Sequence, residues 1–215
     1  MTTWMDGYWH KRLDRCKAAL EANRFGARIA DGPEAAGRLI TGTIAAGAVT
    51  VSWGDSMTLA ATGALDVFRA DPKIRLIETF DPSVDRAELI ERRRAALTVD
   101  LFLTGTNAVT EAGQLVNLDM VGNRVAGITF GPRQVVIVVG RNKLVPDVGA
   151  AMDRIRSYAA PLNAIRHDFP TPCAGTGRCE NCNSSRRICN TWTITEKSYP
   201  PGRVQVILIN RDLGL

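Results

Sequence analysis

Four of the chain's five cysteines lie within seventeen residues near the C-terminal end, in the stretch CAGTGRCENCNSSRRIC. Their spacing is C-x5-C-x2-C-x6-C, over Cys173, Cys179, Cys182 and Cys189. We expect the two residues inside the C-x2-C pair to form a turn that brings both thiolates to one side, so that the flanking cysteines can complete a tetrahedral Zn²⁺ site. A 4Fe–4S cluster also takes four thiolates, and the first spacing is one residue longer than the C-x4-C-x2-C pattern of plant-type ferredoxins.

Other interpretations of these thiols stay open. Without a metal, the four cysteines are either free thiols or include a redox-active disulfide. His167 is an alternative metal ligand in place of one cysteine, although a lone histidine at a helix end is more often solvated. The fifth cysteine, Cys16, falls on the apolar face of a predicted helix over 4–23, so we expect it in the core.

Composition narrows the protein class. With 215 residues, 45% hydrophobic and 23% charged, the chain can bury one sizeable core. The net charge of +5 does not indicate nucleic-acid binding, because 27 basic residues are interleaved with 22 acidic ones and no nucleic-acid module is visible. The longest apolar run, VVIVVG, is far too short for a membrane span. We therefore expect a cytoplasmic protein, in which stable disulfides are disfavoured.

The elements that must position any site follow from apolar periodicity. Apolar strands alternate with amphipathic helices, which predicts a sheet that is covered on both faces. The expected strands span 48–54, 73–80, 99–105, 113–118, 134–140 and 203–210, and the expected helices span 4–23, 33–46, 55–70, 85–97, 123–130 and 147–160. The predicted fold class is α/β, doubly wound and mainly parallel, with a Cys-rich C-terminal loop and a final strand at an edge or beside the switch point.

The chain divides into three segments on this basis. Residues 1–165 form the α/β domain, 166–202 a polar Cys-rich loop without clear periodicity, and 203–215 a strand that returns to the sheet. An irregular stretch of this length in a compact domain is usually functional or held by a metal.

Two strand-to-loop junctions carry polar residues where α/β sheets bind ligands, beyond the carboxyl ends of the strands. In SWGDSMTL, a tight turn at Gly54 places Asp55 or Ser56 at a helix N-cap. With the hydroxyls of Ser56 and Thr58, this turn predicts an anion-binding position, although an ordinary N-cap has the same sequence.

The second junction, TGTNAVTEAGQLVNLDMVGNRVAGITFGP, follows the strand over 99–105. Its polar residues gather around a predicted turn at Ala112–Gly113. Its two carboxylates, those of Glu111 and Asp119, are candidates for a base or a nucleophile. The expected ligand-binding residues at this junction are Gly105, Thr106, Asn107, Asn117, Asp119, Asn123 and Arg124.

These two motifs, with the following GPRQVVIVVGRNKLV, resemble the lactate-utilization (LUD) domain family. The resemblance implies the fold shared by glucosamine-phosphate deaminase, ribose-phosphate isomerase and CoA-transferases, and a role beside iron–sulfur partner subunits in L-lactate oxidation. The segment GTNAVTEAGQLVN is also similar to methylthioribose-phosphate isomerases, which usually carry an Asp where this chain has Asn107. Glu111 falls near the acidic nucleophile of the CoA-transferase relatives.

Three functional hypotheses follow. The favoured one is a LUD-type component of 2-hydroxy-acid oxidation that binds a small carboxylate or phosphorylated ligand and holds a 4Fe–4S cluster or Zn²⁺ on its four cysteines. The second is a CoA-transferase-like or sugar-phosphate-isomerase-like enzyme that uses Glu111. The third is a non-catalytic assembly or regulatory subunit.

Overall fold

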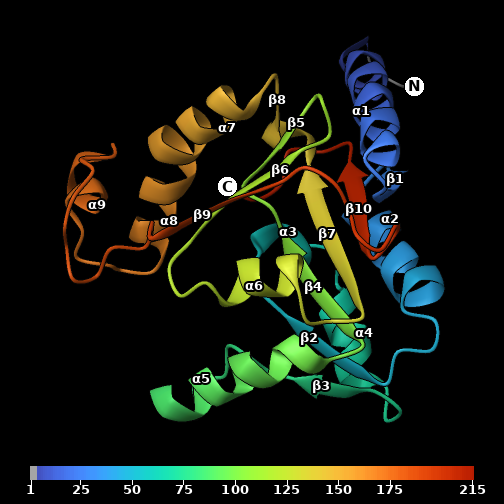
Figure 1. Cartoon of the computed structure of the whole chain (residues 1–215), viewed down its shortest axis with the longest axis horizontal. Coiled ribbons are helices and arrows are strands. Elements are labelled where there is room, and N and C mark those ends of the chain that lie inside the picture. Colours follow the sequence, from blue (N-terminus) through green and yellow to red (C-terminus); the bar gives the residue numbers. More distant parts are fainter. Residues whose placement is uncertain (1–3) are drawn as a thin grey trace.

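A six-stranded parallel sheet forms the centre of the molecule in the computed structural model, which describes residues 4–215 except for the side chains of residues 43 and 44 (Figure 1). The strand order is β1-β10-β7-β4-β2-β3, and every neighbouring pair is parallel. The strands are β1 (Gly26–Ala30), β2 (Thr50–Trp53), β3 (Arg75–Ile77), β4 (Leu101–Gly105), β7 (Gln134–Gly140) and β10 (Val204–Ile209). The α/β, doubly wound prediction is confirmed.

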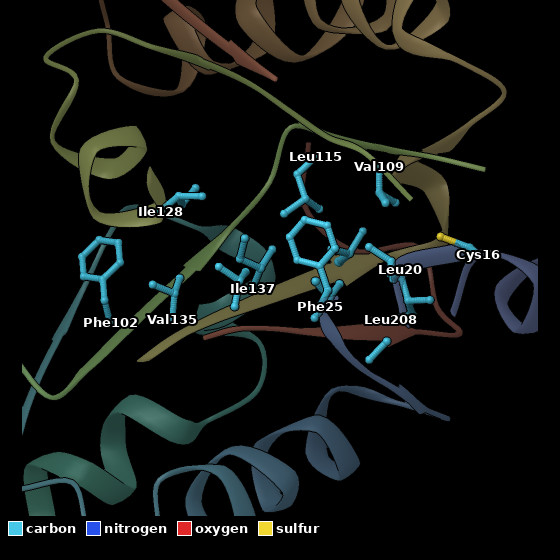
Figure 2. Packing of buried hydrophobic residues seen from close by; sticks show 14 of the residues in the cluster. Cys16, Leu20, Phe25, Phe102, Val109, Leu115, Ile128, Val135, Ile137 and Leu208 are labelled. Atoms are coloured by element: carbon cyan, nitrogen blue, oxygen red, sulfur yellow. The ribbon is translucent and has the colours of Figure 1, made fainter. Parts of the chain in front are cut away.

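Alternate side chains of the central strands enter two separate cores, as a buried parallel sheet requires. Val135 and Ile137 of β7 point to the face covered by α1 (Trp4–Ala22) and α6 (Asn123–Thr129) (Figure 2). Val136 and Val138 point to the opposite face. Cys16 packs with Leu20 and Val109 in the first core, so its predicted place on a buried helix face is confirmed.

Only some of the remaining helices pack on this sheet. α2 (Pro33–Arg38), the π-helical turn η1 (Leu39–Ile44), α3 (Met57–Ala60) and α4 (Ala64–Ala70) contribute to the second core. α5 (Arg86–Ala95) continues into the 3₁₀ turn η2 (Ala96–Thr98), and α7 (Val148–Arg154), η4 (Ile155–Ala159) and α8 (Ala160–Arg166) form one continuous helical arm. The helix expected over 55–70 is broken, because Gly63 adopts a left-handed conformation (φ 69°) before α4.

A second, four-stranded sheet was not expected from the sequence. Its order is β8-β5-β6-β9, and its strands are β5 (Ala108–Thr110), β6 (Leu115–Asp119), β8 (Leu144–Val145) and β9 (Thr191–Thr195). The turn between β5 and β6 has Gly113 at φ 76°, as the Ala112–Gly113 prediction requires. This sheet packs against α7 through Val116, Ala151 and their neighbours.

The Cys-rich segment is therefore more ordered than its composition suggested. It contains α9 (Pro172–Thr176) and β9, which pairs antiparallel with β6, and it packs on α8 through Cys173 and Ile188. The final strand β10 lies inside the sheet, between β1 and β7, because β1, a strand that the periodicity did not reveal, occupies the edge. Among residues 4–215, no helix has the length and apolar character that a membrane crossing requires.

Candidate anion-binding cleft

A cleft of about 320 Å³ opens at the carboxyl ends of β2 and β4. The chain leaves β2 toward β3 at one edge of the sheet and leaves β4 toward β7 on the other side, so these neighbouring strands mark the topological switch point. Open α/β sheets bind their ligands at this position. The cleft walls come from the β2–α3 turn, the β4–β5 turn, the β6–α6 loop, α5, α8 and the 3₁₀ turn η3 (Arg141–Lys143).

Arg124 forms the base of the cleft and joins its loops. Its guanidinium donates from Nη1 to Asn117 Oδ1 (2.7 Å) and from Nη2 to Asn107 Oδ1 (2.9 Å). It also donates to the carbonyl oxygens of Gly105 (3.2 Å) and Leu118 (3.0 Å). Because the residue is only 8% exposed, these bonds make Arg124 a structural clamp between β4, β6 and α6.

The two asparagines of the β5–β6 hairpin complete this network. Asn107 Oδ1 accepts from Leu118 N at 3.0 Å, and Asn117 Oδ1 accepts from Thr106 Oγ1 at 3.0 Å. Asn117 is fully buried, and its Nδ2 has no hydrogen-bond partner among the residues that the structure describes. Asp119 orients α6, because its Oδ2 accepts from Arg124 N at 3.2 Å.

One wall of the cleft is a bridge between the β2–α3 turn and the end of α8. Asp55 Oδ2 accepts from Arg166 Nη2 and lies 3.0 Å from His167 Nε2. Arg166 Nη2 also donates to Asn163 Oδ1 at 2.9 Å. The three charged or titratable side chains are about one-third exposed, so they face the open side of the cleft.

Two further basic side chains line the cleft, Arg93 from α5 and Lys143 from η3. Arg93 lies over the Phe80 ring, with 5.2 Å between the guanidinium carbon and the ring centroid, and its buried Nε has no hydrogen-bond partner within the described chain. Burial lowers the pKa of Arg93, and Asp119 opposes this effect. Lys143 is 5% exposed, and its Nζ donates to Thr58 Oγ1 at 3.1 Å.

These two basic residues were not among those predicted from the sequence. Lys143 follows the carboxyl end of β7 within three residues, so the rule applied to the other two junctions would have included it. Arg93 belongs to ERRRAAL, which reads as a solvated helix face. Only the packing of α5 against Phe80 distinguishes it from its exposed neighbour Arg94.

Most residues predicted from the two junctions meet in this cleft. Those lining it are Asp55, Ser56, Gly105, Thr106, Asn107, Asp119, Asn123 and Arg124. Gly54, Thr58 and Asn117 are buried directly behind this lining, where Thr58 bonds Lys143 and Asn117 bonds Arg124. Ser56 is the N-cap of α3, with its Oγ accepting from Leu59 N at 3.1 Å.

Glu111 lies elsewhere, beside the β5–β6 turn and against α1. Its carboxylate accepts from Arg12 Nε (3.0 Å) and Nη2 (2.6 Å), and it is not among the residues that line the cleft. The structure thus separates the carboxylate chosen from the sequence from the other predicted residues.

Comparison with known protein families shows the family to which the chain belongs. The sequence profile of the LUD domain matches residues 13–209. The chain belongs to the LUD domain family. The match includes the four cysteines and the final strand, so the family resemblance extends beyond the central block in which the sequence first showed it.

Solved structures similar to this LUD domain have low sequence identity. A DUF162 family protein from Deinococcus radiodurans has 15% identity over 94% of this chain and 98% of its own, with a TM-score of 0.49. The translation initiation factor eIF-2B of Pyrococcus horikoshii OT3 has 15% identity over 48% of this chain and 44% of its own, with a TM-score of 0.29. No curated protein sequence matches the chain significantly.

The four cysteines of this LUD domain lie in one region but do not form a coordination site in this conformation. Among the described residues, no three or more His, Cys, Asp or Glu side chains are grouped so as to hold a metal ion. All four thiols are free, and Cys173 is buried, with its Sγ 3.3 Å from Thr171 Oγ1. Burial raises the pKa of Cys189, Arg187 opposes this effect, and the other three thiols each raise it further. The thiols are thus close enough to interact, although they do not converge on a common centre.

Proposed function

We propose that this LUD domain binds a small carboxylate of the 2-hydroxy-acid or 2-oxo-acid class at the switch point of its sheet. The observation that carries the proposal is the set of guanidinium groups around the cleft, those of Arg93, Arg124 and Arg166, against the carboxylates of Asp55 and Asp119. Arg93 supports it most directly, because its guanidinium lines the cleft and forms no hydrogen bond or ion pair within the described chain, which leaves it available to a carboxylate.

The family gives this ligand a metabolic context. The LUD domain family is associated with lactate utilization, and L-lactate and pyruvate are small monocarboxylates that a cleft of about 320 Å³ holds with room to spare. We propose that the domain acts in, or supports, oxidation of L-lactate or a similar 2-hydroxy acid. A phosphorylated ligand is the alternative, because phosphate presents a similar but larger negative charge.

Thermal unfolding with a panel of ligands tests the proposal. A ligand at ten times its dissociation constant adds about 1.4 kcal/mol to the stability of the folded state, which corresponds to a melting-temperature rise of about 3–6 °C for a chain of this size. L-lactate or pyruvate should produce this rise, whereas lactamide, which lacks the carboxylate, should not. A rise in melting temperature with inorganic phosphate in place of the carboxylates would identify the alternative, a phosphorylated ligand.

The variant Arg93→Met provides the matched test of the site. It keeps an apolar contact with Phe80 but removes the unused N–H, so the ligand-induced rise should fall to zero or nearly so. Arg94→Met on the exposed side of α5 should leave the rise unchanged. If no member of the panel raises the melting temperature at millimolar concentration, the anion-binding function is wrong.

We also propose that Cys173, Cys179, Cys182 and Cys189 take up one Zn²⁺ or one 4Fe–4S cluster after the segment rearranges locally. Four thiols on one segment, three of which raise the pKa of the fourth, Cys189, support this. Anaerobic purification with metal analysis and a visible spectrum distinguishes the two. The double variant Cys179→Ser, Cys182→Ser should lose the metal, and Cys16→Ser, in the core beneath α1, should retain it. Metal-free protein after anaerobic reconstitution would exclude the site.

A further inference from the structure

Lys143 is the one lysine of this chain that lies inside the protein. It follows β7 in the turn η3 and lines the cleft, whereas Lys11, Lys73 and Lys197 are exposed and Lys17 pairs with Glu21 at the surface. A Cβ atom placed on Gly214 would lie 3.1 Å from Lys143 Nζ, so backbone covers the amine on that side. The Lys143 amine is therefore enclosed by the protein on the side that faces the C-terminal segment.

The surroundings of Lys143 do not favour a positive charge. An ammonium group has three N–H donors, yet Thr58 Oγ1 is the only acceptor found for Nζ among the described residues. No carboxylate among the described residues forms an ion pair with Lys143, and the charged groups that act on its pKa are the guanidinium groups of Arg154 from α7 and Arg124 from α6. Burial chiefly, and these two cations, lower the pKa of Lys143 to about 7.

A neutral amine beside an anion-binding cleft is a nucleophile rather than a counterion. Thr58 is placed to assist it, because its hydroxyl accepts a hydrogen from Lys143 Nζ and donates its own to Leu213 O at 3.1 Å. A lysine whose function was only to attract a carboxylate would keep its charge, and therefore a high pKa, at neutral pH.

We propose that Lys143 forms an imine with the carbonyl carbon of a 2-oxo acid held in the cleft, an inference that rests on the proposed carboxylate-binding function. The amine nitrogen attacks the carbonyl carbon, and a proton passes from nitrogen to the former carbonyl oxygen, which gives a carbinolamine. The C–O bond then breaks as water leaves, and the C=N bond forms. Amine and ketone give imine and water, so the step needs no oxidant or reductant. Arg93 and Arg166 are the cations available to hold the carboxylate of the 2-oxo acid.

Reductive trapping tests the imine. The full-length protein is incubated with pyruvate and sodium cyanoborohydride at pH 7, and modified lysines are located by peptide mass spectrometry. Labelling of Lys143 should exceed that of Lys11, Lys73 and Lys197 by tenfold or more, because at pH 7 an ordinary lysine is almost entirely protonated. Its initial rate should rise with pH and reach half its maximum near pH 7.

Two variants and one binding measurement separate the possible outcomes. Lys143→Arg replaces the nucleophilic amine with a guanidinium and should abolish the selective label, whereas Lys73→Met should leave it unchanged. If pyruvate raises the melting temperature but Lys143 is labelled no faster than the exposed lysines, the imine is wrong and carboxylate binding stands. Selective labelling without any such rise would support the amine chemistry and argue against a preformed carboxylate site. Absence of both would overturn both proposals.

Discussion

The buried amine of Lys143 should make the stability of this protein depend on pH. Its pKa is about 7 in the folded chain and 10.5 for an unperturbed lysine. Between these values the unfolded chain holds a proton that the folded chain has released, so the free energy of unfolding rises with pH across this window. Below pH 7 the folded side chain is protonated as well, and the penalty for burying it is present in full.

The size of this effect follows from the two pKa values. At 1.36 kcal/mol per pH unit, the gap between 10.5 and about 7 corresponds to about 5 kcal/mol. Relative to a neutral side chain of similar size, Lys143 therefore destabilises the folded state by about 4–5 kcal/mol at pH 6–7 and by about 2 kcal/mol at pH 9. Replacing Lys143 with a neutral side chain also removes its hydrogen bond to Thr58, which lowers the resulting gain in stability by about 1 kcal/mol at every pH.

Urea unfolding of the parent protein and of Lys143→Met, under reducing conditions from pH 6 to 9, measures this difference. The variant should be more stable by about 3–4 kcal/mol at pH 6–7 and by about 1 kcal/mol at pH 9. Comparison with the variant is needed because burial also raises the pKa of Cys189, and that of Cys16 to about 12, which lowers stability as the pH rises above 9.

Lys73→Met, at an exposed position, is the matched control and should show no such trend. The reasoning about Lys143 would be refuted by a stability difference that stays constant from pH 6 to 9. It would equally be refuted if Lys143→Met were less stable than the parent protein at pH 6, because the buried lysine would then have a charged native state with an adequate partner.

Three further predictions concern the architecture of the cleft. Arg124→Gln should lower the free energy of unfolding by about 3 kcal/mol or more in urea titrations, whereas Arg133→Gln, at an 85% exposed side chain, should cost less than about 1 kcal/mol; equal losses would contradict the clamp. Gly105→Ala should lower the free energy of unfolding by about 1–3 kcal/mol, because its Cβ would lie 2.5 Å from Ser56 Oγ. Adding Ser56→Ala should recover part of this loss. If the effects of the two substitutions are strictly additive, the two side chains are not in contact. Ser56→Ala alone should cost about 1 kcal/mol through loss of the α3 cap, as measured by its urea midpoint, and no change would show that the cap is dispensable.

Elements and site residues could be predicted from the sequence wherever a single residue type or a single hydrophobic period determines the local structure. The unbroken apolar run of β7 could only be a strand buried on both faces, and the structure has it over the predicted residues. Asp55, Ser56 and the residues from Gly105 to Asn107 follow strand ends, and parallel strands bring such ends to one edge. Eight of the predicted residues consequently meet in the cleft.

Weakly patterned elements could not be found in this way. β1 has five residues that include Gly26 and Arg28, and it is a strand because β10 offers it a parallel partner. β9 alternates Thr with Trp192 and Ile194, but its polar surroundings concealed a strand that pairs with β6. Whether a short segment pairs as a strand depends on partners that are distant along the chain. The sequence of a segment with a weak pattern therefore gives little indication that it is a strand.

The sequence by itself determined the α/β class, the family and the edge of the sheet at which polar residues gather, because strand periodicity and strand-end chemistry are local. Only the tertiary structure decided which charges share the cleft. It paired Glu111 with Arg12 outside the cleft and placed Arg93, from a helix whose sequence indicates a solvated face, in the cleft. It also buried Lys143 beside Thr58, where no carboxylate of the described residues forms an ion pair with it. Burial and pairing set the charge state of a side chain, and both depend on residues that are distant along the chain.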